Sequence, residues 1–172
     1  MRIRPACQPA EAPKHGKDPE ARVGRRPDTW PVPSDATSLD FWVGDWSCTW
    51  EGGRGRNGIT KGMDGHVVVE RFESLEPERW SGMSVSVFDR EQGWRQTWVD
   101  STGNYWALHG SPHAEGFSFS VVEIEDGREI EKRMVFSEIE ADTFDWRWER
   151  STDGGATWEL LWTIDYRRAG DA

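Results

Sequence analysis

The sequence predicts an all-β protein: a single antiparallel up-and-down β-barrel of about ten strands, preceded by a short helical turn and a flexible N-terminal arm. Three observations predict this architecture. Apolar and polar residues alternate over short runs, as they do in strands that bury one face. Glycine-containing turns separate these runs, and no long stretch keeps a helical period.

Residues 1–37 are expected to form a flexible, disordered Pro-rich arm, and residues 38–172 to form the barrel domain. Seven of the nine prolines lie before residue 34, where large apolar side chains are scarce. Such a segment buries too little surface to offset the entropy lost on ordering. The length of 172 residues suits one domain with a tail of this kind.

The elements are expected to follow one another as strands and tight turns after a single helical turn. Ser38 is the expected cap of that turn, which continues through Leu39–Trp42. A Gly-rich loop is expected over residues 52–58, and Asp64-Gly65 is the centre of an expected hairpin. The expected strands cover residues 45–51, 59–63, 66–72, 81–89, 94–101, 105–109, 117–125, 130–137, 143–150 and 157–167.

Consecutive hairpins without crossover helices form an antiparallel meander, and closing it into a barrel removes the exposed edges of the sheet. Eight strands make a barrel that side chains just fill or that holds one small ligand. Ten strands make a wider barrel, so we expect an interior cavity.

The alternation predicts that one face of the sheet is rich in indole side chains. Three expected strands carry this pattern. The residues that share the aromatic face are Trp94, Gln96, Trp98 and Asp100; Phe144, Trp146 and Trp148; and Trp158, Leu160, Trp162, Ile164 and Tyr166. Aromatic rings facing the axis would make a flat-walled, partly polar cavity.

The charge balance excludes several classes of partner. The chain has 21 Lys and Arg against 31 Asp and Glu, a formal net charge of −10. Phosphate backbones and anionic membranes attract basic surfaces, so neither a nucleic acid nor a membrane is expected as a partner. No apolar run is long enough to span a membrane and no secretory signal is recognised, so we expect a cytoplasmic location. Cys7 and Cys48 are expected to be free thiols.

Four segments together resemble a bacterial family of uncharacterised proteins, the DUF1579-like proteins, over about residues 38–168. The segments are Phe41–Trp46, Trp98–Gly103, Ser151–Trp158 and Asp165–Arg168. The family is similar in outline to lipocalins and nitrobindins, and the resemblance implies a calycin-like barrel with no established activity.

Gly44-Asp45-Trp46 resembles the Gly-x-Trp motif of lipocalins. The resemblance implies that Trp46 plugs the closed end of the barrel and that Arg167 or Arg168 lies across its ring. Nitrobindins bind haem through a histidine, for which His109 is the best-placed candidate, although no nitrobindin motif surrounds it. We therefore expect no cofactor, with haem as an alternative.

Two short motifs match known patterns by letter. Ser151–Trp158 fits the Asp-box, which we interpret as a hairpin staple, because a sialidase needs several such boxes on a propeller. Gly53–Gly58 fits Gly-x-Gly-x-x-Gly, but a strand follows it where dinucleotide binding requires a helix. Arg54 and Arg56 could still contact a small anion at the barrel rim.

A metal site is expected to be absent. His109 and His113 are four residues apart, but Gly110 and Pro112 exclude the helix that would align them, and with His66 as a possible third ligand the fold would have to bring all three together.

The ionisable residues expected to face or rim the cavity are Asp100, Glu73, Glu149, Arg147 and His109. A carboxyl in a Trp-lined pocket could act in acid–base chemistry. The alternative, which we favour, is that Asp100 caps the Thr102-Gly103 turn and that Glu149 and Arg147 pair across strands on the outer face.

The sequence leaves two functions open. The first is binding of a small apolar or aromatic molecule in the cavity, and the second is a cyclase, isomerase or hydratase with Asp100 and His109 as its catalytic groups. A homodimer formed through an exposed face is a further possibility. The expected ligand-binding residues are Trp98, Tyr105, His109, Trp146, Trp148 and Met83.

Overall fold

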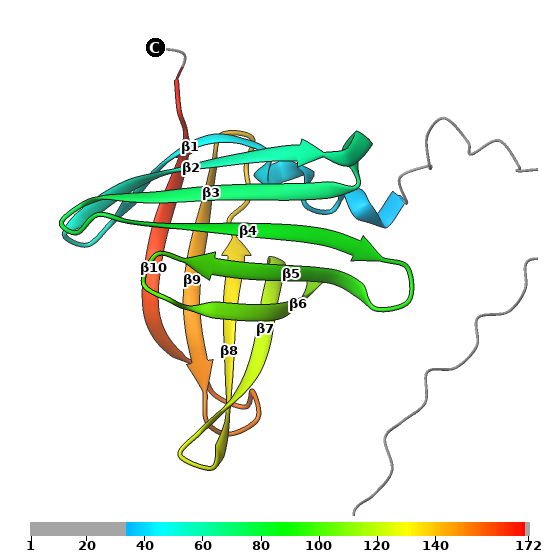
Figure 1. Ribbon diagram of the computed structural model, residues 1–172, viewed down its shortest axis with the longest axis vertical. Helices are drawn as coiled ribbons and strands as arrows, with labels where there is room; N and C mark the ends of the chain where they lie inside the picture. Colours follow the sequence, from blue (N-terminus) through cyan, green and yellow to red (C-terminus); the bar gives the residue numbers. More distant parts are fainter. Residues whose placement is uncertain (1–33, 171–172) are drawn as a thin grey trace, which may run out of the picture. The chain divides into compact units, whose positions relative to one another are not determined.

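The protein folds into a closed barrel of ten antiparallel strands, as the sequence predicts (Figure 1). The computed structural model describes residues 34–170. Most of the predicted arm and Cys7 lie outside the described residues. The elements are η1 (Ser34–Thr37), η2 (Asp40–Trp42), β1 (Gly44–Trp50), β2 (Gly53–Gly62), η3 (Met63–Gly65), β3 (Val67–Glu76), β4 (Trp80–Asp89), β5 (Gly93–Asp100), β6 (Tyr105–His113), β7 (Gly116–Glu125), β8 (Arg128–Ser137), β9 (Thr143–Ser151) and β10 (Glu159–Arg168).

Each strand pairs with its neighbours in the sequence, and β1 pairs with β10 to close the barrel. The closing register places Trp46 opposite Arg168 and Cys48 opposite Tyr166. The pairing of β6 with β7 covers only His109–His113 and Gly116–Ser120, so the rest of these two strands has no ladder partner on that side. None of the helices in the described part of the chain is long and apolar enough to cross a membrane.

The helical turn before β1 is present as η2, but Ser38 does not cap it. The hydroxyl of Ser38 donates to the Asp35 carbonyl and accepts a hydrogen bond from the Trp94 indole at 2.7 Å. Leu39 occupies the N-cap position without a side-chain hydrogen bond. Ser38 therefore ties the turn to β5 rather than satisfying the amides of η2.

The prediction of a Gly-rich loop is wrong, because residues 53–58 belong to β2. A Cβ atom at Gly55 would lie 2.5 Å from the Glu73 carbonyl oxygen and 3.2 Å from the Trp50 ring. Position 55 thus requires glycine because neighbouring atoms pack closely against the strand there, not because the backbone forms a loop. Arg54 and Arg56, the candidates for an anion contact, form ion pairs with Glu76 and Glu73.

The inward face predicted for the last strand is correct only from Trp162 onward. The pairing of β10 with β9 shifts register between Leu160 and Trp162. A bulge of this kind breaks the two-residue alternation. Leu160 is accordingly 54% exposed, and Trp158 lies before the strand, in the preceding turn.

One end of the barrel is closed by Trp46, in the role that the lipocalin resemblance implies. Trp46 is buried and donates its indole N–H to the Trp42 carbonyl at 2.8 Å. The guanidinium of Arg168, not that of Arg167, lies 4.3 Å from the centre of its ring. Arg168 also donates to the Val43 and Ala141 carbonyls. This residue therefore joins the start, the end and the β8–β9 turn of the barrel.

The turn between β9 and β10 has the predicted Asp-box structure. Asp153 accepts hydrogen bonds from Ser151 and from the amide and hydroxyl of Thr157, and Gly154 has a φ of +69°. The Trp158 indole donates to the Gly155 carbonyl at 3.0 Å.

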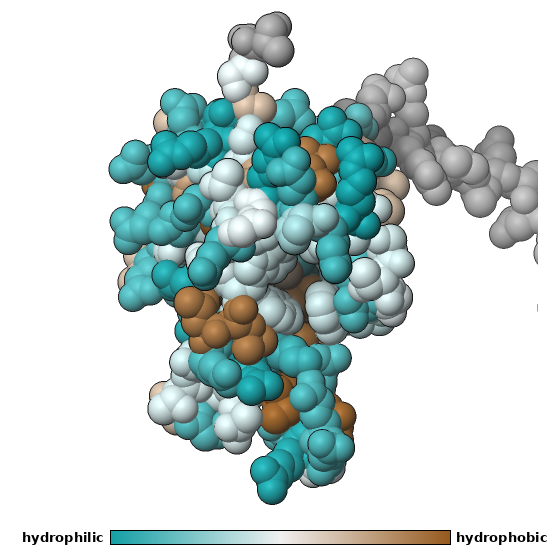
Figure 2. All heavy atoms as spheres, turned by 90° about the vertical axis from the view of Figure 1, so that its left-hand side faces the viewer, coloured by the Kyte–Doolittle hydropathy of each residue, from teal (hydrophilic) through white to brown (hydrophobic). Residues whose placement is uncertain are grey.

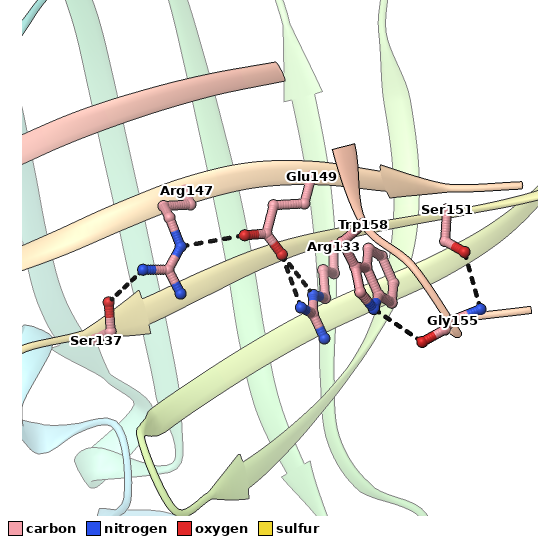
Figure 3. A network of polar contacts seen from close by, with 7 residues as sticks. All are labelled: Arg133, Ser137, Arg147, Glu149, Ser151, Gly155 and Trp158. Atoms are coloured by element: carbon pink, nitrogen blue, oxygen red, sulfur yellow. Dashed lines mark hydrogen bonds and ion pairs between the residues drawn. The ribbon is translucent and has the colours of Figure 1, made fainter. Parts of the chain in front are cut away.

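The Asp-box turn lies beside an ionic network on the outer face of β8 and β9 (Figure 3). Glu149 accepts hydrogen bonds from Arg133 across the strands and from Arg147 on its own strand. The Arg133 guanidinium lies 3.7 Å from the centre of the Trp158 ring. Glu149 and Arg147 do form an outer-face ion pair, but the prediction that they pair across strands is wrong, because both lie on β9 and the cross-strand partner of Glu149 is Arg133.

Candidate functional site

The interior of the barrel contains a cavity of about 270 Å³. Its wall is mostly aromatic and includes two carboxyl side chains. The residues that line it are Glu70, Phe72, Trp80, Trp98, Asp100, Thr102, Asn104, Trp106, Met134, Trp146, Trp148, Trp162, Ile164 and Tyr166. The end of the barrel that holds the β1–β2, β3–β4 and β5–β6 turns faces the viewer in Figure 2, where the surface is hollowed near its centre.

Six indoles form the walls of the cavity, and strand alternation places them there. Trp106 faces Trp148 at a centroid distance of 5.2 Å, and Trp148 is nearly parallel to Trp146. Trp162 packs edge-on against Trp146. A Cβ atom at Gly82 would lie 2.2 Å from the Trp98 ring, so this glycine on β4 leaves the space that Trp98 occupies. The rings contact one another and together line the cavity.

A layer of buried polar side chains forms the floor of the cavity. The Glu70 carboxyl accepts a hydrogen bond from the Asn57 amide at 2.7 Å and one from the Ser84 hydroxyl at 2.6 Å. The Asn57 amide also donates to the Tyr166 hydroxyl, and Gln96 donates to Ser84. Strands β2, β3, β5 and β10 thus each contribute one inward-facing polar group, and β4 contributes two, Ser84 and Ser86.

Tyr166 shows where this polar layer lies along the barrel. Its ring stacks on Phe144 at a centroid distance of 4.3 Å and packs edge-on against Trp46, which closes the barrel. Its hydroxyl belongs to the polar layer, and the residue also lines the cavity. The polar layer therefore separates the aromatic plug from the cavity.

Burial raises the pKa values of the ionisable groups in and next to this layer. Desolvation raises the pKa of Glu70 to about 7, although the hydrogen bonds from Ser84 and Asn57 oppose the rise. Desolvation also raises the pKa of the Cys48 thiol to about 12 and that of Tyr166 well above its ordinary value. Glu70 is thus the group in the layer that changes charge near neutral pH.

Asp100 lies at the end of β5 and is the second carboxyl of the cavity. It accepts hydrogen bonds from the Trp98 indole, from the amide and hydroxyl of Thr102 and from the Asn104 side chain. Partial burial opposes ionisation, but the hydrogen bonds from Thr102, Asn104 and Trp98 hold the pKa of Asp100 well below its usual range. Asp100 therefore caps the β5–β6 turn, as the preferred interpretation has it, and carries a fixed negative charge.

The residues predicted to bind a ligand separate into two groups. Trp98, Trp146 and Trp148 line the cavity together with Asp100. Tyr105, His109 and Met83 are exposed on the outer face, and none of these three lines the cavity. Trp106 and Leu108 point inward on β6, so Tyr105 and His109 point outward by alternation.

The predicted pair of Asp100 and His109 is therefore not assembled. Glu73 and Arg147 form ion pairs with Arg56 and Glu149 and do not line the cavity, and neither does Glu149. No histidine borders the cavity among residues 34–170, so His109 cannot hold a haem there. The described residues also contain no group of three or more His, Cys, Asp or Glu side chains placed to hold a metal ion.

Sequence reasoning missed Glu70, Trp80, Trp106 and Trp162 as a set that surrounds the cavity. Trp162 was assigned to the inner face but not to the site. Glu70 carries a signal that could have identified it, because it shares one strand face with Val68 and Phe72. A carboxyl between two apolar residues on an inward face is a strong indication of a functional or structural polar site.

The chain matches no protein-family model, and a search of curated proteins finds no match. The ten-stranded antiparallel barrel is consistent with a calycin-like fold. The narrower resemblance to the DUF1579-like family has no support from these comparisons.

Proposed function

We propose that the protein binds a small, mostly apolar or aromatic molecule in the cavity of its barrel. The single observation that carries this proposal is the unfilled, indole-lined space of about 270 Å³ in a barrel whose other end is densely packed. Protein interiors are close-packed, and voids of this size are few in a domain. A void of this size between flat aromatic faces suits a planar guest.

The size and lining of the cavity limit the ligand. Engineered apolar cavities of about 150 Å³ accept benzene, and drug-sized ligands occupy pockets of about 300–1,000 Å³. A cavity of about 270 Å³ therefore suits a molecule of one or two fused rings. Burial of apolar surface provides about 25 cal/mol per Å², and ring stacking adds to it.

The enzymatic alternative with Asp100 and His109 has no geometric support. His109 is exposed on the outer face, and Asp100 is already occupied by five donor groups of its own turn and strand. A carboxylate held in its ionised form by such hydrogen bonds is a weak base at neutral pH.

Quenching of tryptophan fluorescence by 4-nitroaniline tests the proposal. This neutral planar amine absorbs in the range in which indole emits, so a bound molecule quenches the surrounding tryptophans. We expect saturable quenching, and we expect Trp148→Ala to weaken it about tenfold through loss of stacking area.

Tyr105→Ala is the matched control, since it removes an aromatic ring that is 64% exposed on the outer face. It should leave the affinity unchanged. Quenching that does not saturate, or that depends on Tyr105 and not on Trp148, would contradict binding in the cavity.

A further inference from the structure

We propose that the ligand of this cavity is an organic cation, an amine or ammonium compound whose apolar part lies among the indoles and whose charge faces Glu70 and Asp100. This inference rests on the proposed function and specifies the ligand's chemical class. It follows from the charges of the lining, the state of Glu70 and the kind of wall that surrounds it.

The lining of the cavity has acidic side chains and no basic ones. Glu70 lies at the floor and Asp100 at the β5–β6 turn, and no Lys, Arg or His is among the lining residues. None of the ion pairs formed within residues 34–170 includes either carboxyl. An anionic ligand would meet two carboxyls and no basic side chain there, whereas a cation would meet two carboxyls that have no cationic partner.

Of the two carboxyls, Glu70 supports the inference more strongly than Asp100, because it is buried without an opposite charge beside it. Its exposed fraction is 6%, and its hydrogen-bond donors, Asn57 and Ser84, are both neutral. Buried charges in proteins are normally paired with an opposite charge or a metal ion. An ammonium group at the floor of the cavity would supply the missing charge and a further donor.

The polar layer around Glu70 is also short of donors. The side-chain oxygens of Asn57 and Gln96 are buried and accept no hydrogen bond within the described residues. Both unsatisfied groups are acceptors, and buried polar groups are normally satisfied. Neither residue lines the cavity, so this shortage of donors adds to the negative character of the layer beneath Glu70 without a direct contact to the ligand.

The walls of the cavity favour the same class of ligand. The faces of aromatic rings are negative, and tryptophan attracts cations most strongly among the aromatic residues. Six of the lining residues are tryptophans, joined by Phe72 and Tyr166. A cage of aromatic faces with a carboxyl at its floor recognises an ammonium group by charge and by contact with the rings together.

Isothermal titration calorimetry at pH 8 with three indole compounds tests this inference. Tryptamine carries an ammonium group, tryptophol is its neutral analogue with a hydroxyl, and indole-3-propionate is an anion of similar size. A primary ammonium stays protonated at this pH. We expect tryptamine to bind at least about tenfold more tightly than tryptophol, and indole-3-propionate to bind most weakly.

Glu70→Gln separates the charge from the shape of the site. We expect it to weaken tryptamine binding about tenfold and to change tryptophol binding less than about twofold. Retained tryptophol binding also shows that the variant folds. Glu129→Gln, which removes an exposed carboxyl on β8, is the control for net charge and should leave both affinities unchanged.

The outcomes distinguish this inference from the proposed function. If tryptophol binds the wild-type protein as tightly as tryptamine, the ligand is not selected as a cation, and only this inference fails. If none of the three compounds binds although 4-nitroaniline does, only this inference fails; if 4-nitroaniline does not bind either, the proposed function fails with it. The comparison within the wild-type protein decides the question even if Glu70→Gln does not fold.

Discussion

Glu70 is the residue on which the chemistry of the interior depends. Placing a carboxyl on an inward-facing position of β3 costs free energy when the group is charged, since it leaves water without gaining an opposite charge. The hydrogen bonds from Asn57 and Ser84 recover part of this cost. The remainder appears as the raised pKa of about 7, so the empty protein holds this group partly protonated at neutral pH.

This pKa predicts how stability depends on pH. Between pH 4.5 and about 7, the folded protein holds a proton on Glu70 that the unfolded chain has lost. Stability therefore falls as pH rises through this window, and the loss is complete above the folded-state pKa. One pH unit corresponds to about 1.4 kcal/mol, so the contribution amounts to about 3 kcal/mol. The facing titratable groups, Cys48 and Tyr166, remain neutral because burial raises their pKa values.

Glu70→Gln isolates this contribution, because glutamine has the same shape and no titration. We expect the free energy of unfolding of the variant, relative to wild type, to rise by about 3 kcal/mol from pH 4.5 to pH 8. Urea unfolding followed by tryptophan fluorescence measures it. The control Glu129→Gln should show no such rise, and a pH-independent difference for Glu70→Gln would contradict the raised pKa.

The same carboxyl predicts the pH dependence of cation binding. A bound ammonium favours the ionised form of Glu70, so binding of a cation releases the proton that the group holds. Tryptamine affinity should therefore rise by up to about tenfold per pH unit below pH 7 and level off above it. Calorimetry at pH 5.5, 6.5 and 7.5 checks this, and the dependence should vanish in Glu70→Gln. A tryptamine affinity that is flat over this range in the wild-type protein would show that Glu70 does not face the charge.

At the scale of single residues, sequence reasoning identified the indoles but not the acid between them. Trp98, Trp146 and Trp148 were found because alternation in their strands is regular. Glu70 was missed because Val67-Val68-Val69 reads as apolar on both faces, which hides the alternation that places Glu70 inward. The prediction placed Tyr105 and His109 inward, because the apolar residues of β6 occur at adjacent positions and do not show which face of the strand is buried.

At the scale of elements, turn chemistry was predictable and strand irregularity was not. The Asp-box between β9 and β10 is encoded by a short motif whose side chains bond to their own backbone. The bulge in β10 and the glycine-rich course of β2 depend on contacts with neighbouring strands and with Trp50. Such contacts are not visible in a single segment of sequence.

Asp153→Ala tests the role of the Asp-box in stability. Asp153 stabilises the turn by accepting hydrogen bonds from Ser151 and Thr157. The ordered turn holds Trp158 beside Arg133. We expect the substitution to lower the free energy of unfolding by about 1–2 kcal/mol. Thermal unfolding followed by circular dichroism measures this, with Glu91→Ala in the exposed β4–β5 turn as the control. Equal effects of the two substitutions would contradict the role of a staple.

At the scale of the whole molecule, the barrel has a filled end and a hollow end. The filled end holds the plug of Trp46 and Trp42 with Arg168 across it, and the hollow end holds the six indoles of the cavity. The polar layer around Glu70 separates the two. Closure by ten strands was predictable because consecutive hairpins leave few alternatives, and the width of such a ring makes a cavity expected.

This division predicts that stability and binding respond to different substitutions. Arg168→Met removes the cation from the Trp46 ring and the hydrogen bonds to the Val43 and Ala141 carbonyls. We expect a loss of about 2 kcal/mol in the free energy of unfolding, with tryptamine affinity within about twofold of wild type. Urea unfolding and calorimetry on the same preparation check both. A large loss of affinity in the folded variant would show that the plug and the cavity are coupled.

The crystal structure of the protein grown with tryptamine tests the central claim most directly. The account predicts one indole ring among Trp98, Trp106 and Trp148, with its ammonium nitrogen within hydrogen-bond distance of a Glu70 carboxyl oxygen. Tryptamine bound only on the outer surface, with the space between the tryptophans closed by their own side chains, would contradict it.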